Sequence, residues 1–178
     1  FGLASYPAIR EALVAASTDT EITQIVLDID SGGGAVNGVE DTANLIRMIN
    51  DKVKPVTAFT DGTMASAAYW LGCSAGNVYC GRTSLVGSIG VISMHMEYSQ
   101  QLKDDGVGVT VVRAGKYKAL LNGVEAPTKE AIAGLQSLLD ATYNVFVEHV
   151  ADMRGRTVQQ ADETMAQGRE FVGEQAVG

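Results

Sequence analysis

The sequence predicts one α/β domain with a largely parallel sheet. Apolar, β-branched runs alternate along the chain with segments whose apolar residues recur at helical spacing, which is the pattern of strands joined by helices. The first such run, residues 22–30, leads into the glycine-rich break Ser31-Gly32-Gly33-Gly34 and then into a helical pattern. Residues 109–113 are nearly continuously apolar, which favours a sheet covered on both faces.

Two strand–turn–helix units are expected in the first half of the chain. After the glycine-rich break, apolar residues at positions 39, 43, 46 and 49 fall on one face of a helix. Residues 55–60 have strand composition, and the Ala-rich segment after them, with Tyr69 and Trp70, is typical of a buried helix. The expected elements are strands over residues 22–30, 55–60, 77–80 and 89–94, a helix through positions 39–49, and a helix over residues 65–71.

The second half is expected to be mainly helical. Apolar residues from Ile132 to Val150 trace one face of a long helix, with Thr128 as its N-cap and Gly155 after its end. The chain begins without Met and stops just after a predicted helix start, so the single domain expected over residues 1–178 is compatible with a fragment of a longer protein. The expected elements are helices over residues 98–104, 129–153 and 158–165 and strands over residues 109–113 and 169–172.

The composition is that of a soluble globular domain. Of the 178 residues 46% are hydrophobic, which is enough for a sizeable core without a disulfide framework. Thirteen basic and 21 acidic residues give a net charge of −8, so we do not expect a nucleic-acid partner. The sequence contains no apolar run of membrane-spanning length. Cys73 and Cys80 lack zinc-type partners, so we expect free thiols in a reducing compartment and neither metal nor cofactor.

Several familiar catalytic motifs are absent. His95 and His149 lie outside any metal-binding motif, and His149 falls on a surface-like stretch of the long helix. The glycine turn lacks the residue order of a phosphate-binding or dinucleotide-binding loop. Ser66 is flanked by Ala on both sides, so the GxSxG nucleophile elbow is not present. Metal-dependent hydrolysis, nucleotide binding and a Ser-His-Asp triad are therefore disfavoured.

A serine nucleophile with a lysine base remains, which is one variant of the catalytic triad. Ser66 follows a predicted strand and opens the Ala-rich helix, so its hydroxyl would lie at the positive end of that helix, where free amides suit a developing oxyanion. From its position alone, the more frequent role of such a serine is that of a small residue which allows close helix packing.

Four blocks of sequence occur together in a characteristic order. They are Asp30-Ser31-Gly32-Gly33-Gly34-Ala35-Val36, Met64-Ala65-Ser66-Ala67-Ala68-Tyr69-Trp70, Thr83-Ser84-Leu85-Val86-Gly87-Ser88-Ile89-Gly90-Val91 and Gly115-Lys116-Tyr117-Lys118-Ala119. In these blocks, and in residues 168–176, the chain resembles the signal peptide peptidase A family, including its phage prohead (capsid) protease branch. The resemblance implies a ClpP/crotonase-like fold of stacked β-β-α units, and homo-oligomers in the form of rings or barrels.

The resemblance also implies roles for particular residues. The family usually has Ser-Pro-Gly-Gly where this chain has Ser-Gly-Gly-Gly, so a fixed φ that would help to hold an oxyanion amide is missing. The implied roles are Ser66 as nucleophile, Lys118 as general base, Ser88 as the serine that orients the base, and the backbone amides of Gly34 and Ala67 as the oxyanion donors.

Lys118 can act as a base only if it is removed from water. A lysine in water has a pKa near 10.4, so only about one in a few thousand is neutral at pH 7, and burial lowers such a pKa by roughly 3 to 5 units. We expect the apolar neighbours Tyr117, Ala119, Leu120 and Leu121 to line a dry site around Lys118. Lys116 follows Gly115 and is expected to lie in water.

The sequence therefore predicts a serine endopeptidase with a Ser-Lys dyad, which cleaves peptides or unfolded protein segments in phage capsid maturation or signal peptide degradation. Two alternatives stay open: a crotonase-like acyl-CoA enzyme in which Asp61 supplies a carboxylate, and a non-catalytic assembly scaffold. The long helix and the hydrophobic segment 89–96 are candidate subunit contacts. We expect a cytoplasmic location, in the host or in capsid assembly, or membrane association if an N-terminal anchor is missing.

Overall fold

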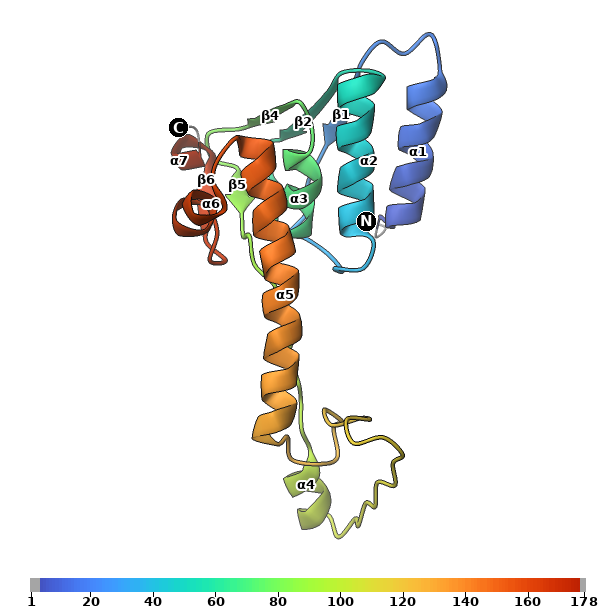
Figure 1. The fold of residues 1–178 in the computed structure, drawn as a ribbon, viewed down its shortest axis with the longest axis vertical. Helices are drawn as coiled ribbons and strands as arrows, with labels where there is room; N and C mark the ends of the chain where they lie inside the picture. Colours follow the sequence, from blue (N-terminus) through green and yellow to red (C-terminus); the bar gives the residue numbers. More distant parts are fainter. Residues whose placement is uncertain (1–3, 177–178) are drawn as a thin grey trace. The chain divides into compact units, whose positions relative to one another are not determined.

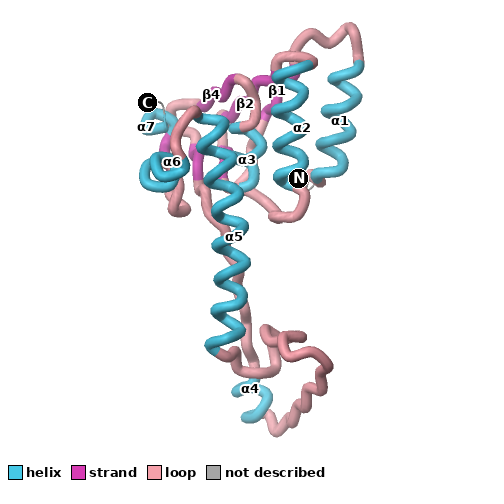
Figure 2. The backbone as a smooth tube through the Cα atoms, in the orientation of Figure 1, coloured by secondary structure: helices cyan, strands magenta, loops and turns pink. Residues whose placement is uncertain are grey.

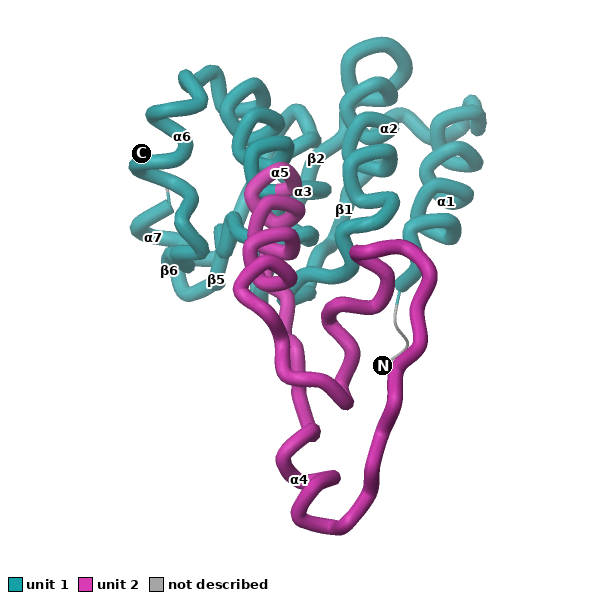
Figure 3. The backbone as a smooth tube through the Cα atoms, turned by 60° about the horizontal axis from the view of Figure 1, so that its bottom comes forward, with its two compact units in different colours: residues 1–90, 143–178 teal, residues 91–142 magenta. Residues whose placement is uncertain are grey.

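The computed structural model describes residues 4–176, and the chain divides into two compact units (Figure 3). The first unit takes in the chain up to residue 90 and again from residue 143, and the second is Val91–Thr142. The parts of the predicted domain at residues 1–3 and 177–178 lie outside the described residues. Each unit is described by itself below.

The first unit contains two three-stranded sheets (Figure 1). The pairing is parallel except between the last two strands of the second sheet, so the expected α/β class with mainly parallel strands is confirmed. The first sheet has the order β1 (Ile25–Asp28), β2 (Val56–Thr60) and β4 (Asn77–Cys80), and the second has the order β3 (Thr63–Ala65), β5 (Leu85–Gly87) and β6 (Glu170–Val172).

The helices α1 (Tyr6–Thr18), α2 (Val39–Lys52) and α3 (Ala67–Cys73) of the first unit lie side by side, with α2 in contact with both of the others (Figures 1 and 2). The first of them begins at Ser5, whose side chain accepts a hydrogen bond from the amide of Ala8, and it has a proline in its first turn. A capping box at Thr157 begins a short helix near the C-terminal end. The helices of this unit are α1 (Tyr6–Thr18), α2 (Val39–Lys52), α3 (Ala67–Cys73), α6 (Val158–Thr164) and α7 (Gly173–Ala176).

The core of the first unit packs α2 and α3 against the first sheet and against the C-terminal part of the long helix α5 (Lys129–Arg154). Phe146 of α5 is 1% exposed, and its ring stacks on Trp70 with 4.2 Å between the ring centroids. Cys73 and Cys80 are free thiols, as expected. Burial raises the pKa of Cys73 to about 12.

The second unit consists of α4 (Ser99–Asp104), residues 129–142 of α5 and irregular chain. Most of the segment between α4 and α5 is loop (Figure 2). Thr128 caps α5, as predicted, because the amide of Ala131 donates to its Oγ1 at 3.1 Å. Large apolar side chains of this unit are exposed, among them Ile92, Met94, Met96 and Val112.

Two predicted strands are wrong and three elements were not predicted. Residues 89–94 and 109–113 are irregular, because neither apolar run pairs with another strand in the described part of the chain. The helix α1 and the three-residue strands β3 and β5 are additional. Of the helices described, none is both long enough and apolar enough to cross a lipid bilayer.

Candidate active site

Ser66 lies in a sharp turn between β3 and α3. Its backbone has φ 53° and ψ −126°, a conformation that costs a residue with a side chain about 1–3 kcal/mol. The amide of Ser66 donates to the carbonyl of Gly87 at 2.8 Å, and its own carbonyl accepts from the amide of Trp70. The partly exposed side chain makes no capping hydrogen bond with α3. Ser66 thus occupies a strained strand-to-helix turn, the backbone geometry that the GxSxG motif also adopts, although that motif is absent here.

Ser88 lies at the same edge of the second sheet as Ser66. Because β3 and β5 are parallel and Ala65 pairs with Gly87, each serine is one residue beyond that pair. Ser88 also has a positive φ, 52°, and its amide donates to the carbonyl of Arg169 at 2.7 Å. The structure therefore brings these two predicted site residues together.

The glycine-rich turn passes directly over Ser66. Ser31 forms a parallel bridge with Met64, so the turn starts alongside β3. A Cβ on Gly33 would lie 2.8 Å from the Cβ of Ser66 and 3.1 Å from its Oγ, and the φ of Gly33 is 124°. Only glycine tolerates this approach and this φ. Gly33, which the sequence did not single out, is thus the turn residue packed on Ser66, and the predicted oxyanion residue Gly34 follows it.

Two side chains of α1 hold the loop that follows the glycine turn. The hydroxyl of Tyr6 donates to the carbonyl of Ala35 at 2.6 Å. The Nη1 of Arg10 donates to Thr42 Oγ1 at 3.0 Å and to the carbonyl of Gly38 at 3.4 Å. Sequence reasoning missed both residues; the available signal was a Ser-x-Pro helix start that places them one turn apart.

Lys118 belongs to the second unit, where it follows a turn whose Gly115 carbonyl accepts the Lys118 amide at 3.1 Å. Its side chain is exposed, so the burial expected for it is not found in the single chain. Of the neighbours expected to line a dry site, Tyr117 is 67% exposed and Ala119 is exposed, while Leu120 and Leu121 are half-buried without enclosing Lys118. Because Ser66 lies in the first unit, the pairing of Ser66 with Lys118 stays a prediction.

Lys116 is in water, as expected. Its Nζ lies 2.8 Å from Oε1 of Glu130. The hydrogen bond to Glu130, and a weaker one to the Tyr117 hydroxyl, raise the pKa of Lys116. A raised pKa stabilises the protonated amine, which is the opposite of what a general base needs.

His149 corrects one prediction, since it faces inward rather than lying on a surface. Its Nε2 is 2.7 Å from the hydroxyl of the buried Ser74. The same hydroxyl lies 2.9 Å from the carbonyl oxygen of Trp70, to which it can donate. The pair therefore ties α5 to the C-terminal end of α3.

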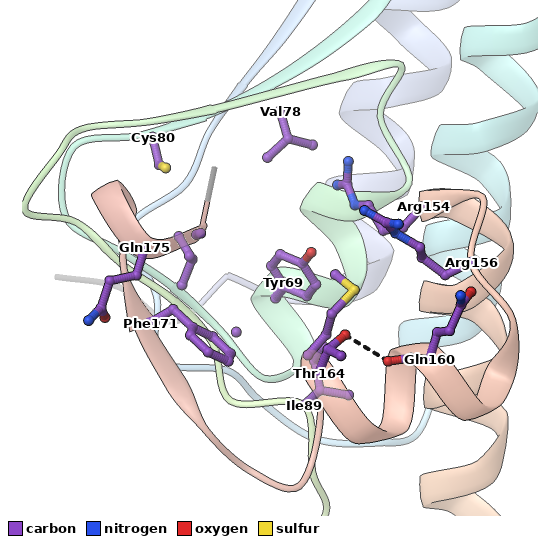
Figure 4. Close-up of a pocket in the computed structure, with 14 residues that line it drawn as sticks. Tyr69, Val78, Cys80, Ile89, Arg154, Arg156, Gln160, Thr164, Phe171 and Gln175 are labelled. Atoms are coloured by element: carbon purple, nitrogen blue, oxygen red, sulfur yellow. Dashed lines mark hydrogen bonds between the residues drawn. The ribbon is translucent and has the colours of Figure 1, made fainter. Parts of the chain in front are cut away.

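A cavity of about 580 Å³ lies next to α3 in the first unit (Figure 4). Its walls include Tyr69, Ile89 and Phe171, together with Gly87, whose carbonyl accepts the Ser66 amide. Arg154 also lines the cavity, with its guanidinium carbon 5.9 Å from the centroid of the Tyr69 ring. Burial raises the pKa of Tyr69, and the charge of Arg154 opposes this shift. The cavity is thus mainly apolar, with two cations, Arg154 and Arg156, in its wall.

Comparisons with known proteins identify relatives along most of the chain. A family model described as peptidase family S49 matches residues 48–178. Head-tail preconnector protein GP5 of Enterobacteria phage P21 is 34% identical over 165 residues, 93% of this chain and 33% of that protein. Capsid assembly protease C of Escherichia phage lambda is 33% identical over 165 residues, 93% of this chain and 37% of that protein. Protease 4 of Salmonella typhi is 30% identical over 161 residues, 90% of this chain and 26% of that protein. The chain therefore spans well under half the length of these relatives.

Proposed function

The chain belongs to peptidase family S49, and we propose that it is a serine endopeptidase domain with a ClpP/crotonase-like fold that cleaves peptides or unfolded protein segments. The observation that carries this proposal is the conformation of Ser66. A serine held at positive φ between a strand and a helix, uncapped and packed under a glycine turn, presents its hydroxyl at a site where backbone amides can hold an oxyanion.

In the proposed reaction the neutral amine of Lys118 takes the proton from the hydroxyl of Ser66. The Ser66 oxygen attacks the substrate carbonyl, and the amides of Gly34 and Ala67 donate hydrogen bonds to the resulting oxyanion. The tetrahedral species collapses as the protonated Lys118 gives its proton to the leaving amine, which leaves an ester on Ser66. Water then attacks this ester with Lys118 as base, and Ser66 regains its proton as the acid product leaves. Ser88 would orient the Lys118 amine.

Association of subunits would supply the dry environment that Lys118 lacks in the single chain. The exposed apolar side chains of the second unit, which contains Lys118, suit a contact between copies of the chain. We propose a homo-oligomer whose contacts exclude water from the amine, with the base supplied by the same or by a neighbouring subunit. Activity should then rise steeply with protein concentration through the range in which the oligomer forms.

The substrate class follows from the relatives. One relative is named as a capsid assembly protease and another as a head-tail preconnector protein. We propose protein substrates of capsid assembly, cleaved in the host cytoplasm, as the first set to examine. Signal peptides are the second set.

The test is cleavage of an unfolded protein by purified wild-type protein and by three variants, with the fragments identified by mass spectrometry. We expect Ser66→Ala to lower kcat by a factor of about 10⁶, or to the detection limit. Lys118→Met should lose activity as well, whereas Lys116→Met, which removes a nearby exposed amine, should keep it. Cleavage by Ser66→Ala at the wild-type rate would rule out the proposed nucleophile. A peptide phosphonate should add covalently to Ser66 in the wild-type protein only.

A further inference from the structure

The glycine turn of this chain has three consecutive glycines and no proline, so no ring fixes a φ angle in it. Its internal hydrogen bonds among the described residues are those that Ser31 Oγ makes with the amide and the carbonyl of Gly33, both at 3.2 Å. Its first end is fixed to β3. The Ser31 amide donates to the carbonyl of Thr63 at 2.7 Å, and the Ala65 amide donates to the carbonyl of Ser31 at 3.1 Å. The C-terminal end of the turn has no strand partner in the described chain. It is held instead by side chains of α1, beginning with the hydrogen bond from Tyr6 to the carbonyl of Ala35.

We propose that Tyr6 is a positioning residue, which holds the Gly34 amide in place by fixing the carbonyl of Ala35 two peptide units further along. The inference rests on the proposed function, because it assigns Tyr6 to the same oxyanion site. Residues 32–34 then lie between two fixed points, the Ser31 bridge and the Tyr6 hydrogen bond. The missing proline of the turn is thus compensated from another part of the chain.

The geometry around Tyr6 supports this role. A Cβ on Gly34 would lie 3.3 Å from the Tyr6 hydroxyl oxygen, and a Cβ on Gly38 would lie 3.4 Å from Cδ2 of the Tyr6 ring, so the hydroxyl approaches the turn itself and the ring packs on the loop that follows it. Arg10, one helical turn later, binds the next stretch of the loop through the Gly38 carbonyl. Desolvation raises the pKa of Tyr6, so the hydroxyl keeps its proton and remains a donor through the neutral range.

The expected effect of Tyr6→Phe is on the chemical step. The substitution keeps the ring and removes the single hydrogen bond to Ala35, so the Gly34 donor stays present but is less well held. Complete loss of an oxyanion donor lowers kcat by about 10² to 10³. A mobile donor should lower it less, by about 10-fold, with KM unchanged because the oxyanion exists only after attack.

The experiment compares wild type, Tyr6→Phe and Ser17→Ala by kcat, KM and thermal unfolding. Ser17 is the matched control, because it also lies on α1 and, among residues 4–176, its hydroxyl bonds only to the nearby Val14 carbonyl. We expect Ser17→Ala to behave as wild type. A peptide boronate, which forms a tetrahedral adduct, should bind Tyr6→Phe about 10-fold more weakly, whereas an uncleaved product peptide should bind equally.

A second variant separates positioning from general stability. Gly32→Pro restores a fixed φ to the turn; a Cβ at Gly32 has no atom within 4 Å, and the Gly32 amide makes no hydrogen bond to a described residue. In the Tyr6→Phe background it should recover most of the lost kcat. A Tyr6→Phe protein with wild-type kcat, with a raised KM alone, or with a loss of kcat that Gly32→Pro leaves untouched, would overturn the inference. An active Ser66→Ala protein would instead refute the proposed function, whatever Tyr6 does.

Discussion

The contact between Gly33 and Ser66 allows a sharp prediction for Gly33→Ala. The new Cβ would lie 2.8 Å from the Cβ of Ser66, closer than real Cβ atoms come, so the turn or the serine must move by a sizeable fraction of an ångström. A displacement of about 1 Å at a reacting group costs about 10²-fold in rate. The φ of 124° adds strain of about 1–3 kcal/mol, which should lower Tm by about 5 °C.

The assay is kcat/KM on an unfolded protein substrate at a temperature at least 15 °C below the Tm of the variant, so that the protein is folded. We expect a loss of about 10²-fold. Gly32→Ala is the matched control, since no atom lies within 4 Å of a Cβ at that position, and it should retain activity. If both alanine variants cleave at the wild-type rate, the turn does not constrain Ser66 and the geometric reasoning is wrong.

Two further predictions concern the packing of α5. Burial lowers the pKa of His149, Arg47 lowers it further and Asp152 opposes the shift, so the folded protein binds a proton at His149 less readily than the unfolded chain. The neutral His149 therefore contributes its full stabilisation above about pH 6.5, the ordinary pKa of a histidine in the unfolded chain, and this stabilisation declines as the pH falls below that value. Urea unfolding at pH 7.5 and pH 5.5 should show that the free energy of unfolding falls less for His149→Gln than for wild type. Phe146→Ala should cost about 3–5 kcal/mol, or about 10 °C in Tm, because the removed ring is fully enclosed; a change under 1 kcal/mol would show that the cavity collapses.

The elements that the sequence predicted well are those whose pattern is local. The segment 77–80 is β4 within the predicted bounds, and the long apolar face beginning at Lys129 is α5. The two wrong strands, residues 89–94 and 109–113, have strand composition, but a strand also needs a partner, which periodicity cannot supply. The strand β3 was missed for the converse reason: three residues carry almost no pattern, and its partner β5 defines it.

The site was predictable where it depends on order along the chain. The helix that follows Ser66 was expected from its local pattern, whereas Ser88 was expected only from the family resemblance, and the pairing of β3 with β5 then places it beside Ser66. The contact of Gly33 with Ser66 and the hydrogen bond of Tyr6 join segments about thirty residues apart, and a single sequence carries no signal for such pairs. The predicted burial of Lys118 is not found in the single chain because residues adjacent in sequence need not pack around one another: Tyr117 is exposed, and the half-buried Leu120 and Leu121 do not cover the Lys118 side chain.

The backbone conformation of Ser66 lowers the stability of the folded chain, although the proposed function needs a side chain at this position. Glycine would adopt the same φ of 53° at no steric cost, so Ser66→Gly should fold at least as well as the natural chain while lacking the hydroxyl. A laboratory selection for thermal stability alone would tend to replace Ser66 by glycine, and only a screen for catalytic activity would retain the serine.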